Sequence, residues 1–153
     1  MEPASIEQVR KSAEDSLACG FLCAESVVLA IAKAEGVESS VLPGIATAFC
    51  SGMARSGGTC GALTGAIMGV SLALGRRSAS DSVEPSYTAT QRVVQEFENE
   101  FGSRDCSSLL DGCDLNTPEG QAMFKEQKLG RRCFQFTGKA AEIAAQVIRD
   151  SKG

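Results

Sequence analysis

Thr59-Cys60-Gly61-Ala62-Leu63-Thr64-Gly65-Ala66-Ile67-Met68-Gly69-Val70-Ser71-Leu72-Ala73-Leu74 is a stretch without a charged residue or a proline. It is apolar on all sides, which predicts a buried helix from Cys60 to about Leu74, capped by Thr59, at the centre of the protein. Its glycines recur every four residues, at 61, 65 and 69. This spacing predicts a groove in which a second helix packs closely or a cofactor binds.

The rest of the chain also favours helices, because apolar residues recur at spacings of three and four and no convincing strand pattern appears. Ser5 with Gln8 forms a capping-box pattern, and Thr117-Pro118-Glu119 is typical of a helix start. The predicted helices cover residues 5–17, 23–35, 40–49, 60–74 and 85–101, a short segment capped by Ser103, a segment from 117, and a last segment that follows Cys133. We therefore predict an all-α fold, a compact single-domain bundle of about six to seven helices over residues 1–153.

The cysteine and histidine counts narrow the chemistry, because the chain has seven cysteines and no histidine. Ser-His and Cys-His catalytic pairs, zinc sites of the Cys/His types and histidine-ligated haem are excluded within one chain. The odd number of cysteines, spread along a chain long enough to bury a core, is unlike a disulfide-stapled secreted scaffold. Sulfur is therefore the expected carrier of any chemistry.

Charge and hydrophobic runs bear on three questions: nucleic-acid binding, cellular location and membrane insertion. The formal net charge is −4 and the pI is near 4.9, so the chain lacks the basic footprint of a nucleic-acid-binding protein. The first residues lack the basic and apolar stretches of a secretory signal, which predicts a cytoplasmic location. The uncharged run from Ser56 to Gly75 begins as a loop and leaves about sixteen helical residues, fewer than a bilayer requires, so we predict no stable membrane span.

Cys60 is the first candidate for reactive chemistry. A glycine-rich loop with Gly57 and Gly58 delivers it to the N-terminal end of the central helix. Unpaired N–H groups and the positive end of the helix dipole favour thiolate over thiol at that place, so we expect a lowered pKa. The two loop glycines, together with Gly61 and Gly65, are candidates for binding a cofactor, although their spacing matches no Walker or dinucleotide fingerprint.

Four cysteine-bearing blocks follow one another along the chain: Gly20-Phe21-Leu22-Cys23-Ala24-Glu25-Ser26-Val27, then Phe49 to Ala66 with Cys60 near its centre, then Phe101-Gly102-Ser103-Arg104-Asp105-Cys106, then Cys133 before the Ala-rich last helix. From about Gly20 to Ile143 the chain resembles the family of redox-active proteins named for a C_GCAxxG_C_C cysteine pattern. The resemblance implies that the shared cysteines, which carry the family's redox role, are Cys23, Cys60, Cys106 and Cys133. Cys19, Cys50 and Cys113 are additions to this pattern. Extra metal ligands, resolving thiols and ordinary buried residues are the three interpretations of each, with buried packing the main one.

Two mechanisms are open for the four shared cysteines. In thiol–disulfide redox chemistry Cys60 attacks as a thiolate, and Cys23 or Cys133 resolves the mixed disulfide. Arg131 and Arg132 would lower the pKa of Cys133 if their side chains turn toward it. In the alternative, thiolates of Cys23, Cys60, Cys106 and Cys133 hold an iron–sulfur cluster or another metal ion. The chain has no Cys-x-x-Cys pair, so either site has to be assembled by the tertiary fold.

A non-catalytic binding or interaction role is a third alternative, supported by the glycine groove. The short helices also favour a homodimer, in which two chains would share a site. If the protein is an enzyme, both redox interpretations predict an oxidoreductase. The sequence does not identify the cofactor, the redox partner or the substrate.

Overall fold

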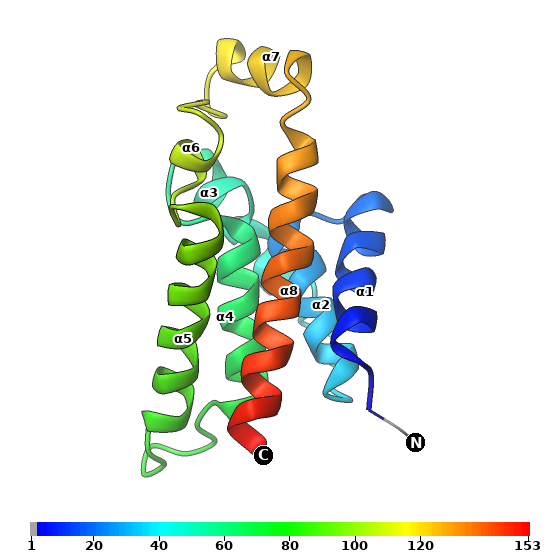
Figure 1. Ribbon diagram of the computed structural model, residues 1–153, viewed down its shortest axis with the longest axis vertical. Coiled ribbons are helices and arrows are strands. Elements are labelled where there is room, and N and C mark those ends of the chain that lie inside the picture. Colours follow the sequence, from blue (N-terminus) through cyan, green and yellow to red (C-terminus); the bar gives the residue numbers. More distant parts are fainter. Residues whose placement is uncertain (1–2) are drawn as a thin grey trace.

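Helices form almost all of the regular structure of residues 3–153, the part of the chain that the computed structural model describes (Figure 1). In chain order they are α1 (Ile6–Ala18), α2 (Cys23–Ala34), the 3₁₀ helix η1 (Gly44–Phe49), α3 (Cys50–Arg55), α4 (Gly61–Leu74), α5 (Glu84–Phe101), α6 (Cys106–Leu109), α7 (Pro118–Glu126) and α8 (Gly130–Lys152). No strand occurs in these residues, and the all-α prediction is confirmed.

The uncharged helix α4 lies among α2, α5 and α8 and packs against all three, as predicted for a central helix (Figure 1). Its glycine groove is filled by α2. A Cβ added at Gly65 would lie 2.7 Å from the Ala24 carbonyl oxygen, and one at Gly69 would lie 2.8 Å from Ile31 Cγ1. In the described part of the chain, neither α4 nor any other helix combines the length and apolarity needed to cross a membrane.

Three phenylalanines join α5 to α8 inside the core. Phe97 is fully buried, and its ring meets Phe101 and Phe136 edge to face at centroid distances of 5.0 and 6.4 Å. Phe101 and Phe136 are themselves 4.8 Å apart. Such edge-to-face pairs add roughly 0.5–1.5 kcal/mol each to the free energy of burying the rings. This aromatic trio fixes α5 against α8 near the end of the bundle that carries α7.

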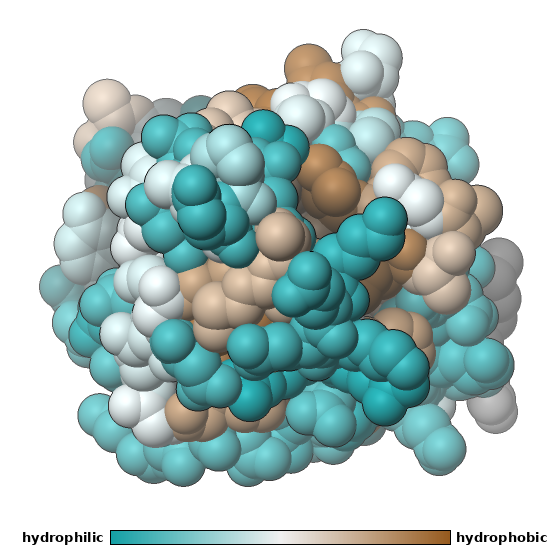
Figure 2. All heavy atoms as spheres, turned by 90° about the horizontal axis from the view of Figure 1, so that it is seen from above, coloured by the Kyte–Doolittle hydropathy of each residue, from teal (hydrophilic) through white to brown (hydrophobic). Residues whose placement is uncertain are grey.

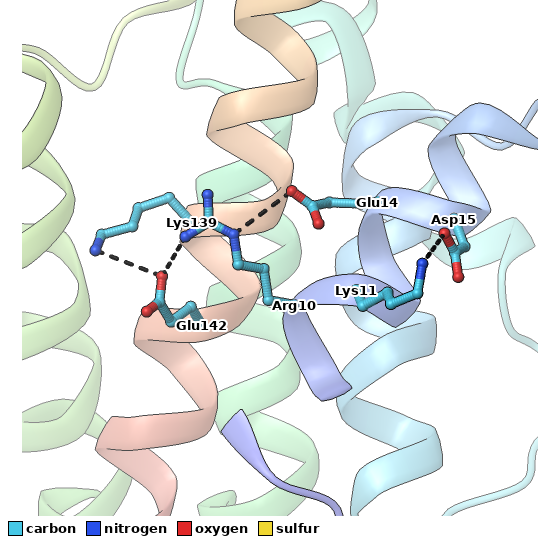
Figure 3. A network of polar contacts seen from close by, with 6 residues as sticks. All are labelled: Arg10, Lys11, Glu14, Asp15, Lys139 and Glu142. Atoms are coloured by element: carbon cyan, nitrogen blue, oxygen red, sulfur yellow. Dashed lines mark hydrogen bonds and ion pairs between the residues drawn. The ribbon is translucent and has the colours of Figure 1, made fainter. Parts of the chain in front are cut away.

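A polar network on the surface joins α1 to α8 (Figure 3). Arg10 donates from Nη1 to Glu142 Oε2 at 2.7 Å and from Nε to Glu14 Oε2 at 3.5 Å. Lys139 Nζ lies 3.4 Å from the same oxygen of Glu142. Partly exposed ion pairs of this kind contribute up to about 1 kcal/mol each. The network orients α1 on α8, while burial of Val9 and Ala13 supplies the main attraction.

Several helix ends follow the predicted capping chemistry. Ser5 Oγ accepts a hydrogen bond from the Gln8 N–H, and the Gln8 side chain accepts one from the Ser5 N–H, which completes the capping box. Thr117 Oγ1 caps α7 by accepting from the Gly120 N–H at 3.0 Å. Gly102 ends α5 in the left-handed conformation, at φ +82°, that favours glycine.

Two predicted N-caps are wrong. Thr59 does not cap α4, because it pairs with Asp105 in an isolated antiparallel bridge and leaves Cys60 as the N-cap residue. Ser103 does not cap α6 either, since Asp105 takes that place. Both differences have one cause, which is the pairing between two loops distant in sequence.

Two predicted helix starts are also displaced. The helix expected over residues 40–49 is confined to a 3₁₀ helix from Gly44, and residues 40–43 form turns. The last helix begins at Gly130, so Cys133 lies inside its first turn and does not precede it.

Candidate functional site

A cavity of about 230 Å³ lies among residues at the end of the bundle that carries α7. Apolar side chains form most of its wall, among them those of Leu109, Leu110, Phe124 and Phe136. It is also lined by one cysteine from each of α2, the N-cap of α4, α6 and α8, namely Cys23, Cys60, Cys106 and Cys133. Figure 2, which looks onto this end, shows apolar atoms in a hollow between hydrophilic residues. The fold thus gathers around one cavity the four cysteines that the sequence analysis singled out.

Loop pairing places Cys60 beside Cys106. The Cys60 N–H donates to the Arg104 carbonyl oxygen at 2.7 Å, and the Cys106 N–H donates to the Gly58 carbonyl oxygen at 2.9 Å. These bonds flank the antiparallel bridge between Thr59 and its partner on the second loop. The start of α4 and the start of α6 are therefore locked together through their backbones.

The segment α3 is a left-handed turn and forms part of the cavity wall. Ser51, Gly52, Met53 and Ala54 have φ values of +58°, +67°, +60° and +56°. Left-handed helical geometry costs residues other than glycine roughly 1–2 kcal/mol each, so the turn is strained. Gly52 is required where it stands, because an added Cβ would lie only 2.6 Å from Cys106 Cβ. The left-handed turn places the backbone of Gly52 directly against the Cys106 side chain.

Two opposing effects act on the Cys60 thiol. Burial raises its pKa, and the N–H groups of Ala62 and Leu63 at the start of α4 lower it. A negative charge on Cys106 or Cys133, once either is ionised, raises it further. Burial dominates, since Cys60 is only 6% exposed, and the pKa rises from an ordinary 9.0 to about 12. The predicted lowering is therefore wrong in sign, although the helix-start contribution that motivated it is present.

We expect Cys60 to be alkylated slowly at neutral pH and progressively faster as the pH rises toward 12. A pKa moved from 9.0 to about 12 reduces the thiolate fraction at pH 7 about a thousandfold. The measurement is the iodoacetamide labelling rate of each cysteine between pH 7 and 10, resolved by peptide mass spectrometry. The exposed Cys19 serves as the internal reference. Labelling of Cys60 as fast as Cys19 at pH 7 would contradict the burial argument.

Cys106 and Cys133 are also held as neutral thiols. Burial raises the pKa of Cys106, and the charge of Cys113 raises it further. Burial, followed by the charge of Cys106, raises the pKa of Cys133 to about 11. Arg132 does not turn toward Cys133 as the sequence allowed: it pairs with Asp111 at 2.8 Å and donates to the Leu109 carbonyl oxygen at 3.2 Å. The expected lowering of the Cys133 pKa by arginine is absent for that reason.

The three additional cysteines have three different surroundings. Cys19 is exposed at the end of α1, on a different helix from Cys23. Cys113 is buried and donates from Sγ to the Gly120 carbonyl oxygen at 3.0 Å, which is a packing role. Cys50 is 2% exposed and belongs to a buried cluster against which Cys23 packs. The spacing of 27 residues between Cys23 and Cys50 carries no local signal for this contact.

The four candidate cofactor-binding glycines are not brought together. Gly61 lines the cysteine cavity, and Gly57 lines a separate polar hollow beside Arg55 and Ser107. Gly58 pairs through its backbone with the loop before α6, and Gly65 is covered by α2. Within residues 3–153, no three cysteine, aspartate or glutamate side chains are grouped closely enough to hold one metal ion.

Comparison with known proteins agrees with the cysteine pattern. Residues 21–147 match the family model described as "Putative redox-active protein (C_GCAxxG_C_C)". An uncharacterized protein of Archaeoglobus fulgidus is 29% identical over 139 residues, which cover 85% of this chain and 86% of that relative. No solved structure matches. Because the family model spans most of the chain and includes all four cysteines of the cavity, this chain belongs to the C_GCAxxG_C_C family.

Proposed function

We propose that this chain performs thiol–disulfide redox chemistry in the cavity lined by Cys23, Cys60, Cys106 and Cys133. The observation that carries the proposal is the convergence of these four thiols, from four separate segments, on one mostly apolar cavity. Exchange with a disulfide requires a thiolate, so the buried thiols of this cavity stay unreactive until one of them loses its proton to begin the exchange. Cys60 remains the lead reactive group, as a thiol that must lose its proton before it attacks.

The expected substrate class follows from the shape and chemistry of the cavity. The cavity has a volume of about 230 Å³ and walls of leucine and phenylalanine side chains. It suits one end of a small disulfide, or a disulfide-bearing side chain, when the part that enters the cavity carries few charged groups. Attack by one thiol forms a mixed disulfide and releases a thiol product. A second cysteine of the cavity then displaces the remaining substrate sulfur and closes an intramolecular disulfide.

The proposal predicts that the number of free thiols in the protein falls when a disulfide compound is added. Protein purified anaerobically and freed of reductant is treated with glutathione disulfide, and free thiols are counted before and after. We expect at least two of the seven thiols to be lost and then recovered with dithiothreitol. The same sample is analysed for metal and for visible absorption. A metal-free, colourless protein whose thiols all persist would contradict the proposal.

The same sample tests the alternative, in which the cysteine thiolates bind an iron–sulfur cluster or another metal ion. If the protein contains iron and shows visible charge-transfer bands that are lost in Cys60→Ser, the cysteines hold a metal centre and the thiol–disulfide mechanism is wrong. The matched control is Cys19→Ser, because Cys19 is exposed and lies outside the cavity. This control should leave both the spectrum and the reversible loss of thiols unchanged.

We further propose that residues 1–153 act as one domain, because one continuous cluster of buried side chains joins α1, α2, α4, α5 and α8. The redox partner in this proposal carries an exposed thiol or disulfide. The homodimer and the cytoplasmic location stay predictions from the sequence.

A further inference from the structure

Cys23 and Cys50 form a pair of thiols of which only Cys23 belongs to the shared cysteine pattern. Cys23 packs against the buried cluster that contains Cys50, and a Cβ added at Gly61 would meet both Cys23 Sγ and Cys50 Cα. Cys23 is half-buried and lines the cavity, whereas Cys50 is 2% exposed and lies behind it among Ala24, Val28 and Ala46. One member of the pair is thus open to a molecule in the cavity, and the other is shielded from it.

The buried carboxylate of Glu25 joins the two segments that carry Cys23 and Cys50. Glu25, 9% exposed, accepts a hydrogen bond from the Leu22 N–H at 2.9 Å and another from Thr47 Oγ1 at 2.6 Å. Thr47 belongs to η1, which ends directly before Cys50. The carboxylate therefore ties the segment that carries Cys50 to the first turn of α2, where Cys23 stands.

The start of α4 presses on the same pair. A Cβ added at Gly61 would overlap Cys23 Sγ and would lie 3.0 Å from Cys50 Cα. Glycine at this place lets the backbone of α4 close over both cysteines. The pair is consequently confined on two sides, by α2 with its carboxylate tie and by α4.

The surroundings of Cys50 suit a thiol that reacts second. Cys50 Sγ donates to the Ala46 carbonyl oxygen at 3.5 Å, and the N–H groups of Ala24 and Glu25 point to the same sulfur. The hydrogen bond with Cys23 is the largest cause that raises the pKa of Cys50, followed by burial, while the two N–H groups lower it. Once Cys23 is bound in a mixed disulfide, its thiol no longer raises the pKa of Cys50, and the N–H groups that favour a Cys50 thiolate remain.

We infer that Cys50 is the resolving cysteine for Cys23, so that the two form a dithiol–disulfide couple beside the cavity. In this couple Cys23, and not Cys60, makes the first attack: its sulfur attacks a disulfide R–S–S–R, forms Cys23–S–S–R, and releases one RSH, which keeps the proton that Cys23 loses. Cys50 sulfur then attacks Cys23 Sγ, closes the Cys23–Cys50 disulfide, and releases the second RSH with the Cys50 proton. Two cysteine thiols are oxidised and one substrate disulfide is reduced.

This inference rests on the proposed thiol–disulfide function, and disulfide mapping tests it separately. Reduced wild-type protein is treated with glutathione disulfide, quenched in acid, alkylated and mapped by peptide mass spectrometry. We expect a Cys23–Cys50 cross-link. In Cys50→Ser the glutathione adduct at Cys23 should persist at least about tenfold longer than in wild type, because its resolving thiol is missing. Cys50→Ala repeats the measurement without a hydroxyl.

The matched control is Cys113→Ser, because Cys113 is equally buried and also lies outside the shared pattern. It should resolve the adduct at the wild-type rate. A wild-type cross-link from Cys23 to Cys60 or Cys133 overturns the assignment of Cys50 and leaves the proposed function standing. Absence of every disulfide after treatment overturns both, and an adduct in Cys50→Ser that resolves as fast as in wild type overturns the assignment alone.

Discussion

Phe97→Ala is expected to lower the free energy of unfolding by about 3–5 kcal/mol, the range for removing a fully buried aromatic ring. Phe97 is 0% exposed and packs edge to face on Phe101 and Phe136. Because Phe136 also lines the cysteine cavity, its ring loses support and the cavity should enlarge. We therefore also expect faster labelling of Cys60. Urea unfolding followed by circular dichroism measures the first effect, and iodoacetamide labelling the second.

The control for this substitution is Phe134→Ala on α8. Phe134 is 39% exposed, so its removal leaves no cavity in the core and should cost no more than about 1 kcal/mol. Equal costs at the two positions would show that the aromatic trio does not support the bundle as argued.

Gly65→Ala is expected to destabilise the protein by roughly 2–3 kcal/mol, even though alanine is the better helix former by about 1 kcal/mol. The new Cβ would lie 2.7 Å from the Ala24 carbonyl oxygen and 2.9 Å from Ala24 Cα, and backbone atoms cannot move aside as the end of a flexible side chain can. α2 and α4 must therefore separate. The midpoint of urea unfolding should fall, with the slope unchanged if unfolding stays two-state.

Gly44→Ala is the matched control for the glycine substitution. An added Cβ at Gly44 meets nothing within 4 Å, and its backbone is not left-handed, so its stability should stay within about 0.5 kcal/mol of wild type. A Gly65→Ala protein as stable as Gly44→Ala would mean that the groove does not require glycine.

Local signals in the sequence were sufficient for most of the helices. The capping box at Ser5 and the left-handed glycine at Gly102 act within a few residues, so the same chemistry operates before and after folding. Thr59 was misread as a cap because its partner, Asp105, lies on a distant loop. The left-handed turn after Cys50 was also missed, because residues such as Met53 and Ala54 carry no preference for positive φ.

The candidate site divides in the same way. The sequence identified Cys23, Cys60, Cys106 and Cys133, because the redox family pattern resides in residue types and their order. It gave no sign that Cys50 lies against Cys23, since that contact depends on how η1 docks on α2. The N–H groups at the start of α4 were foreseen, but their effect on Cys60 is outweighed by burial, which exists only once α4 is surrounded.

By itself, the sequence determined the helical class, the central uncharged helix with its glycine groove and the four cysteines of the family pattern, because periodicity, propensity and residue order can be read from short segments. Only the tertiary structure decided which thiols share a cavity, at which of them burial raises the pKa, and that Cys23 packs against the cluster that contains Cys50. Desolvation and side-chain contact depend on the positions of atoms from helices far apart in the chain.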